Sequence, residues 1–476
     1  MVTVAGVSGS DLRGQAVTYA DFGYVNRIAV STSHVYFATS EGIIKYNRST
    51  DEWEQPLTGA TGIDERDITN IWVDIFDEKL YVRTGDGLWN YDDLFERWYP
   101  IDQLPSFESL TQHVSAPPNM FAPPTFTYDG SGGLTDTYGR TYEFTDVVDD
   151  GSGMLWIGTW GDGPARANSS SNVIELMTFG LIQSQTNAIA FDGDKVVVSG
   201  AAYGQYRTGV TIFDPATLEF TQLESGVNAD FPAVDVNALA ADSNYIYIGT
   251  ENGLYYYDKA SEQFDRHLNR RFGLTDDAVL SLAEMGDSLL VGTNNGLTLV
   301  TYNGDSTLAI SPQELITQSI YDLQVVDSTV WIAASSGAYR YNLRSGALQK
   351  FQDPEAVIFG SVYALDLYGD DLWFASLDAL LQLNLTTGAT KSFKSSAAQV
   401  AYRALAVNDV IAATSSGQGF EIYFHAADRT FSRKFTTADG LPSNNVYQLL
   451  MDGDYIWVGT DRGLTHFWWN NPNRVD

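Results

Sequence analysis

The sequence is dominated by one repeated pattern: a short apolar run, a small residue, Thr or Ser, a polar turn ending in Gly, and another apolar residue. The clearest copies are Leu155–Thr159, Ile246–Thr250 and Ile456–Thr460, and the others begin at Val35, Leu80, Val196, Leu289, Val330, Leu372 and Val410. Successive copies start about 43 residues apart, except for one interval of 75. This period is typical of β-propellers, in which each repeat forms one four-stranded blade.

The residue types within the pattern support this interpretation. A run that is apolar on both faces suits a strand lying between two neighbouring sheets. The small residue that follows it, such as Gly249, lets the next sheet approach closely. The turn Glu251-Asn252-Gly253 has Gly where a tight hairpin needs a positive φ. Each repeat is therefore predicted to contain a first strand, a sandwiched second strand, a hairpin and two further strands.

The two ends of the sequence suggest how the repeats are joined. The last copy is predicted to end after its third strand, near Trp468, whereas Ala16–Tyr19 looks like a spare fourth strand. We therefore predict an all-β chain whose residues 1–476 form a single closed β-propeller of about ten blades, with the N-terminal strand completing the last blade. Such closure removes free sheet edges. Ten blades exceeds the usual four to eight, so a division into five plus five or seven plus three is the alternative.

Composition limits the classes of partner. The 476 residues carry 27 Lys and Arg against 60 Asp and Glu, a formal net charge of −33, which disfavours nucleic acid and anionic membranes. A solvated, soluble surface is the simplest interpretation, and a surface for calcium or a cationic partner is the alternative. The absence of cysteine excludes disulfides and thiolate chemistry. No apolar run of membrane-spanning length occurs, and the first residues do not resemble a signal peptide.

Two segments resemble a known family. Gly440–Val446 with Ile456–Leu464, and Gly273–Asp277 with Gly292–Leu297, are similar to the two-component regulator propeller repeat. Members of that family include periplasmic sensor regions of bacterial hybrid kinases, which recognise glycan fragments, and surface proteins of secretion machinery. The resemblance implies a bacterial, exported propeller that binds a ligand or partner. The chain departs from the sensor pattern because it has no kinase, transmembrane helix or immunoglobulin-like domain.

Candidate binding residues lie on loops of one predicted face, where the connections between blades and the hairpins between second and third strands emerge. A long insertion, Ile101–Gly139, is predicted there as a lid or docking element, or as a covering loop. Aromatic, acidic and Arg side chains on such loops suit sugar stacking or protein contact. Packing against a neighbouring blade is the alternative for each. The predicted ligand- or partner-binding residues are Trp160, Asp162, Tyr203, Tyr206, Arg207, Tyr402 and Arg403.

No cofactor is predicted. The acidic turns Asp149–Gly153 and Asp192–Asp194 would suit calcium, although simple Asx turns are the alternative. The five histidines lack the spacing of a zinc site. No catalytic motif is present, and no pair of carboxylates stands out for glycoside hydrolysis.

These observations predict a non-catalytic, secreted bacterial propeller, extracellular or periplasmic, that binds a protein partner or a surface glycan and acts as a scaffold. The first alternative is a polysaccharide lyase or glycosidase with its site at the centre of the ring. The second is a structural subunit of a cell-surface or secretion assembly.

Overall fold

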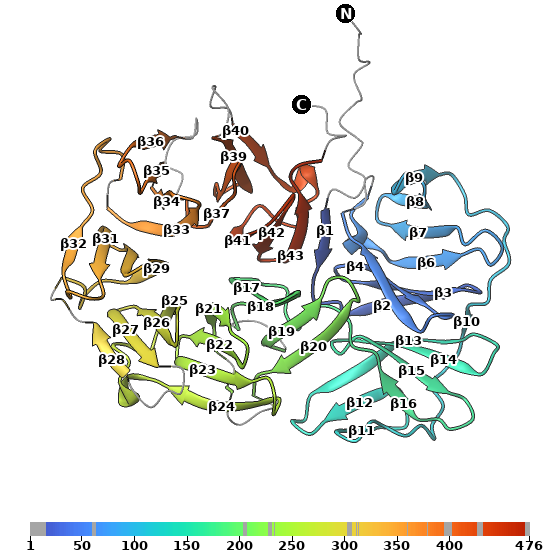
Figure 1. Cartoon of the computed structure of the whole chain (residues 1–476). Coiled ribbons are helices and arrows are strands. Elements are labelled where there is room, and N and C mark those ends of the chain that lie inside the picture. Colours follow the sequence, from blue (N-terminus) through green and yellow to red (C-terminus); the bar gives the residue numbers. More distant parts are fainter. Residues whose placement is uncertain are drawn as a thin grey trace, which may run out of the picture. The chain divides into compact units, whose positions relative to one another are not determined.

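The structure is a computed structural model that describes residues 16–59, 63–202, 207–226, 231–232, 234–301, 307–310, 312, 314–358, 360–377, 379–394, 402–425 and 432–471. These residues form β-strands joined by turns, with three short 3₁₀ helices, Glu65–Asp67 (η1), Arg270–Phe272 (η2) and Thr437–Asp439 (η3) (Figure 1). All ten repeat copies found in the sequence are strands. In the described part of the chain, no helix has the length and apolar character needed to cross a membrane.

The chain divides into two compact units. The first contains residues 1–182, 213–222 and 466–476, and the second contains residues 183–212 and 223–465. The boundary passes through three strands, β19 (Gly209–Asp214), β20 (Glu219–Glu224) and β43 (Gly463–Trp468). Each unit is therefore described on its own.

The first unit contains three antiparallel sheets and strand β1 (Ala16–Tyr19), which forms where it was predicted. One sheet consists of β2 (Val25–Val30), β3 (His34–Thr39), β4 (Gly42–Asn47) and β5 (Glu52–Leu57). The next consists of β6 (Asn70–Val73), β7 (Leu80–Thr84), β8 (Gly87–Asp92) and β9 (Arg97–Ile101). The third consists of β10 (Gln112–His113), β11 (Phe126–Tyr128), β12 (Gly133–Asp136), β13 (Thr141–Asp149), β14 (Met154–Thr159), β15 (Pro164–Asn168) and β16 (Ile174–Leu176).

The inner strands of this unit do not follow chain order. The first sheet is in the middle, because β2 packs against β6 on one side and against β13 on the other. The insertion after Ile101 connects the two outer positions. Along its path, the Glu108 carbonyl accepts a hydrogen bond from the Ile75 N–H at 3.2 Å, and the Thr111 hydroxyl accepts one from the Val30 N–H at 2.9 Å.

Farther along, the insertion joins the third sheet. Its strands β10 and β12 both pair with β13, and β11 pairs with β12. Residues 101–139 were predicted to form a long loop; most of the segment is loop, and short strands form within it. The segment contributes three strands because its backbone groups find partners on the inner strands that it crosses.

The second unit contains five complete antiparallel sheets of four strands each. Their strands are β21 (Val236–Ala241), β22 (Tyr245–Thr250), β23 (Gly253–Asp258) and β24 (Gln263–Leu268); β25 (Val279–Met285), β26 (Ser288–Thr293), β27 (Gly296–Thr301) and β28 (Thr307–Ile310); β29 (Ile320–Val326), β30 (Thr329–Ala334), β31 (Gly337–Asn342) and β32 (Leu348–Lys350); β33 (Val362–Tyr368), β34 (Asp371–Ser376), β35 (Leu380–Asn384) and β36 (Thr390–Phe393); and β37 (Leu405–Val407), β38 (Ile411–Ser415), β39 (Phe420–Phe424) and β40 (Ser432–Phe435).

Two further strand pairs belong to the same unit: β17 (Ala188–Asp192) with β18 (Lys195–Ser199), and β41 (Val446–Asp452) with β42 (Tyr455–Thr460). The inner strands pack one against the next in the order β17, β21, β25, β29, β33, β37 and β41, and β41 packs back against β17. At that junction the Thr186 N–H donates to the Thr460 carbonyl at 2.8 Å. These inner strands therefore form a circuit within the second unit, seen from green to red in Figure 1.

This packing bears on the predicted architecture. The all-β class and the four-stranded propeller repeat are confirmed, but the single ring of about ten blades is not. The circuit of inner strands returns to its start after seven strands of the described residues, and the other three sheets belong to a separate unit. Of the alternatives raised by the sequence, seven plus three matches this division. That the N-terminal strand completes the last blade remains a prediction.

The small residue of each repeat explains how closely the sheets approach. A Cβ atom built on Gly249 would lie 2.6 Å from Cγ1 of Val279, the first residue of the next inner strand. In the first unit, a Cβ on Gly158 would lie 2.6 Å from Cγ1 of Val25. Both distances are too short for non-bonded carbon atoms, so the packing of these sheets requires glycine.

The sheet β6–β9 departs from this rule. At the position of the small residue, β7 carries Arg83, which is exposed. The opposite face of the sheet β6–β9, with Ile71, Val82 and Trp98, is buried against the sheet β2–β5. Because a long charged side chain stands where the neighbouring sheet would have to approach, the stack of the first unit ends at this sheet.

Candidate binding cavity

Five of the seven inner strands of the second unit share an irregularity near their first residue. Register shifts of the β-bulge type occur between the first residue and the third in β21, β25, β29, β33 and β41. A bulge leaves one residue outside the regular pairing and redirects its side chain. The residues at the bulges are Asn237, Leu280, Tyr321, Tyr363 and Tyr447.

All five of these residues line a single cavity of 620 Å³. Its wall contains residues from each of the seven inner strands of the circuit, among them Ala188 of the first and Gln448 of the last. A cavity of this size at the centre of a propeller is suited to a small ligand. The repeat explains its position, because each sheet contributes the same end of its inner strand.

Three tyrosines and one arginine give the cavity its chemical character. The rings of Tyr321 and Tyr363 have centroids 5.4 Å apart, and the guanidinium carbon of Arg403 lies 5.8 Å from the centroid of Tyr363. Tyr447 is 40% exposed. Burial and the nearby charge of Asp461 raise the pKa of Tyr447 above its usual value. The tyrosine hydroxyl therefore stays neutral and can both donate and accept hydrogen bonds.

Partly buried aspartates connect neighbouring inner strands at the cavity wall and beside it. Asp322 accepts the N–H of Leu323 at Oδ1 and the N–H of Leu365, on the next inner strand, at Oδ2, both at 2.8 Å. Asp366 accepts the N–H of Val407 in the same way at 2.7 Å. Burial raises the pKa of Asp322 to about 7 and that of Asp366 to about 6, although these hydrogen bonds oppose the shift.

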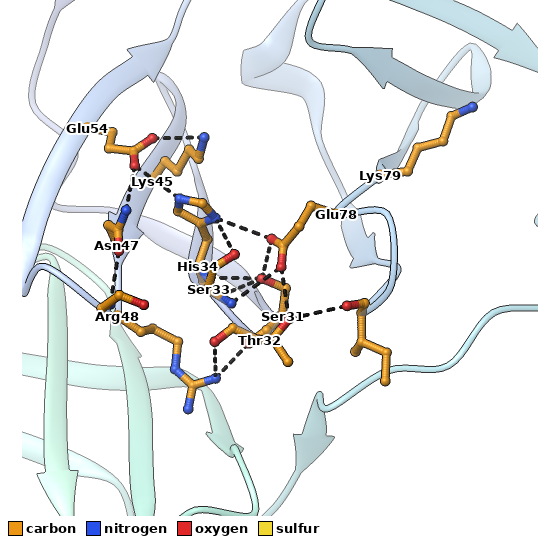
Figure 2. Close-up of polar contacts among 12 residues, drawn as sticks. Ser31, Thr32, Ser33, His34, Lys45, Asn47, Arg48, Glu54, Glu78 and Lys79 are labelled. Carbon is orange, nitrogen blue, oxygen red and sulfur yellow. Dashed lines mark hydrogen bonds and ion pairs between the residues drawn. The ribbon is translucent and has the colours of Figure 1, made fainter.

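A second polar cluster lies in the first unit (Figure 2). His34 is held between two carboxylates, with Nε2 3.0 Å from Glu54 and Nδ1 3.2 Å from Glu78. Glu54 also pairs with Lys45 at 2.8 Å, and Glu78 accepts a hydrogen bond from Ser31 at 2.5 Å. Since Glu78 follows β6 and the other residues belong to the sheet β2–β5, the cluster joins two sheets.

The cluster predicts an acid-sensitive contribution to stability. Burial alone would raise the pKa of Glu54, but hydrogen bonds from Lys45, Asn47 and His34 outweigh it and hold the pKa at about 2. Because this value is below that of an unfolded glutamate, the contribution is present above pH ~4.5 and is lost as the pH falls towards 2. We expect Glu54→Gln to lower stability at pH 7 by about 0.5–1 kcal/mol after solvent screening.

Chemical denaturation at pH 7 and pH 3 measures this effect, with the exposed neighbour Glu52→Gln as the control. The difference between the Glu54→Gln variant and the parent should shrink at pH 3. An equal difference at both pH values would contradict the assignment.

The structure distributes the predicted binding residues over both units. Trp160, in the first unit, is 48% exposed, and its ring packs edge-on against Tyr24 at 5.1 Å. Asp162 follows it in a turn where its N–H donates to the Thr159 hydroxyl at 3.2 Å. Arg207, in the second unit, forms an ion pair with Glu224 at 3.1 Å. The predicted residues Tyr203 and Tyr206 lie outside the described residues.

Tyr402 and Arg403 are adjacent in the sequence but lie in different environments. The Tyr402 side chain is fully buried and its hydroxyl lies 2.9 Å from that of Tyr423, so its position favours packing, the alternative that the sequence left open. Arg403 is exposed and lines the cavity. The cavity therefore brings together Arg403 and the tyrosines of the bulges.

Sequence reasoning missed those tyrosines. A signal was present: in Ile320-Tyr321, Val362-Tyr363 and Val446-Tyr447, a large polar aromatic follows the β-branched residue that opens an inner strand. That position reads as an ordinary strand residue until the bulge is known. Periodicity alone assigns it to a sheet face, whereas the bulge turns it towards the cavity.

The acidic turns have structural partners. Asp150 is buried; it pairs with Arg48 at 2.6 Å and accepts hydrogen bonds from Ser152 and from the indole of Trp156. Among the described residues, no group of three or more His, Asp or Glu side chains is arranged to hold a metal ion.

The fold and cavity define a class, the β-propeller built from short sequence repeats. Comparison with known proteins agrees: residues 440–462 match the family described as two component regulator propeller. This match coincides with one of the two segments in which the sequence resembles that repeat.

The solved structure of PorZ supports the fold across most of the chain. The similar structures include PorZ, an essential bacterial surface component of the type-IX secretion system of Porphyromonas gingivalis, with 12% identity, a TM-score of 0.51 and coverage of 93% of this chain and 68% of PorZ. They also include the extracellular domain of BT4673 from B. thetaiotaomicron, with 14% identity, a TM-score of 0.48 and coverage of 95% and 71%. No curated protein matches the chain.

Proposed function

We propose that the chain is a non-catalytic bacterial binding and scaffold propeller, located outside the cytoplasm, that recognises a protein partner or a surface glycan through the cavity of its second unit. The observation that carries the proposal is the convergence of bulged inner strands on one cavity with tyrosine rings and an arginine. Aromatic rings with a polar tip and arginine are the side chains that contribute most at binding sites. The surface location of PorZ supports the compartment.

A binding comparison tests this function. We expect glycan-array or pull-down signals of the intact chain to fall at least tenfold when Tyr321, Tyr363 and Tyr447 are changed together to alanine, because the stacking surfaces of the cavity are lost. Tyr368→Ala is the matched control, since this tyrosine is 47% exposed and does not line the cavity. Circular dichroism should show that all variants keep their sheet content. Equal binding by the triple variant and the parent would refute a role for the cavity.

The strands within the insertion limit how its role in binding can be tested. Deleting residues 101–139 would remove strands β10, β11 and β12 and the connection between the outer sheets of the first unit. Loss of binding would then report misfolding. Trp160 lies outside the insertion and is exposed. Its substitution by alanine leaves this framework in place and is therefore the better probe of binding by the first unit.

An enzyme is the second candidate, because the cavity holds a carboxylate, an arginine and tyrosines together. Three observations weigh against it. Both oxygens of Asp322 already accept backbone N–H groups, no other acid among the described residues lines the cavity, and glycoside hydrolysis normally needs two carboxylates. The raised pKa of Tyr447 also opposes its use as a base. Release of reducing ends or unsaturated products from a panel of polysaccharides would favour the enzyme.

A structural subunit of a surface assembly is the third candidate, and the description of PorZ as a component of a secretion system favours it. Mass photometry of the chain in native extract separates the two non-enzymatic functions. A particle much heavier than 52.3 kDa supports a stable assembly, whereas a free monomer supports a binding protein.

A further inference from the structure

Arg403 is the one positively charged side chain among the described residues that line the cavity of the second unit. Its guanidinium lies over the ring of Tyr363, and within the described residues no carboxylate pairs with it. The chain as a whole has a formal charge of −33. An exposed arginine that forms no ion pair within the described residues is therefore a local exception to the charge of the molecule, and it lines the cavity.

The geometry of Arg403 indicates what it would bind. A guanidinium that lies over the face of an aromatic ring keeps its N–H edges available for hydrogen bonds. Those edges match the two oxygens of a carboxylate, and such charge-assisted pairs are among the stronger and more directional hydrogen bonds. A neutral ligand would leave this capacity unused. The charge therefore favours a ligand that carries a carboxylate.

The other lining groups indicate the rest of the ligand. Tyr321, Tyr363 and Tyr447 offer flat rings, on which the C–H face of a sugar can stack. Asn187 and Gln448 add side-chain amides, which donate and accept hydrogen bonds as sugar hydroxyls require. The volume of 620 Å³ falls in the range of small-ligand sites and does not admit a folded domain.

We propose that this cavity binds a carboxylated saccharide, with the tyrosines stacking on its rings and Arg403 pairing with its carboxylate. The inference rests on the proposed binding function and narrows it to one ligand class. Arg403 thus acts as the specificity residue that distinguishes an acidic sugar from its neutral counterpart.

Calorimetric titration of the full chain tests the inference. The probes are tetrasaccharides of galacturonic, glucuronic and mannuronic acid, each compared with the neutral tetramer of the corresponding hexose. We expect at least one acidic tetramer to bind ten or more times tighter than its neutral partner. Arg403→Gln keeps a planar polar group without the charge and should abolish that preference. Arg344→Gln, in an exposed turn, is the control that should leave it intact.

Several outcomes would overturn the inference: no acidic tetramer binds, acidic and neutral tetramers bind equally, or the preference survives Arg403→Gln. Displacement of the sugar from the wild-type cavity by a short peptide of equal or higher affinity would instead assign the site to peptides. These failures differ from failure of the proposed function. A chain that still captures a partner in pull-down, with loss of capture in the triple tyrosine variant, remains a binding propeller with another ligand.

Discussion

Gly249→Val should destabilise the second unit by about 2–4 kcal/mol, the range for overpacking a tight site. A Cβ atom at this position would lie 2.6 Å from Cγ1 of Val279 and 3.3 Å from Cβ of Ala238. The inner strand of the next sheet would have to move, and that strand also forms part of the cavity wall. For a unit of this size, we expect the melting temperature to fall by roughly 5–12 °C.

Thermal and urea denaturation measure this effect, and two controls sharpen it. Arg83→Val introduces the same side chain at the equivalent position of the sheet β6–β9, where no neighbouring sheet approaches, and should change stability by only about 0.5 kcal/mol. Val279→Ala, combined with Gly249→Val, should recover part of the loss because it removes the colliding methyl groups. A Gly249→Val variant as stable as the parent would contradict the close packing of the sheets.

The second large effect should come from Asp322→Asn and should depend on pH. Burial raises the folded-state pKa of Asp322 to about 7, above the usual value, so the folded chain favours the protonated carboxyl. The resulting stabilisation is complete below pH ~4 and is lost as the pH rises through 7. Over this range, the stability of the parent relative to the variant should fall by roughly 2–4 kcal/mol, since one pKa unit corresponds to about 1.4 kcal/mol.

The hydrogen bonds of Asp322 also predict the difference in stability between the parent and Asp322→Asn at low pH. Both oxygens of Asp322 accept backbone N–H groups, and an asparagine can replace only one of these acceptors. The variant should therefore be less stable than the parent by about 1–2 kcal/mol at pH 4, and the difference should close or reverse at pH 8. Urea titrations at the two pH values give both numbers.

Asp409→Asn is the matched control, because it removes the same charge from an exposed position of the same unit. Its difference from the parent should vary much less with pH. A difference between the parent and Asp322→Asn that stays constant from pH 4 to pH 8 would show that Asp322 is ionised throughout.

The candidate site was only partly predictable from sequence. Arg403 was identified as a binding candidate, and it does line the cavity. Tyr402, its neighbour, was grouped with it but is buried, because adjacent residues point in different directions and sequence alone did not show which one faces the cavity. Tyr321, Tyr363 and Tyr447 were missed because their orientation depends on bulges that form only when two strands pair.

Arg83 is a sequence feature that indicates where a stack of sheets ends. Among the repeats, glycine or alanine usually follows the second strand's apolar run, as at Gly249 and Ala333, whereas Leu80–Val82 is followed by arginine. That departure marks a sheet with one face on which no neighbour can pack closely. In the structure, this departure coincides with the end of a stack.

The sequence by itself determined the local architecture: ten sandwiched second strands, their hairpins and the four-stranded repeat. These features follow from apolar patterning and turn chemistry, which act over a few residues. Only the tertiary structure decided which sheets are neighbours, how seven inner strands form a circuit, and which side chains meet in the cavity. Those choices depend on contacts between residues far apart in the chain, such as Thr186 with Thr460, and nearly identical repeats offer many pairings of similar local energy.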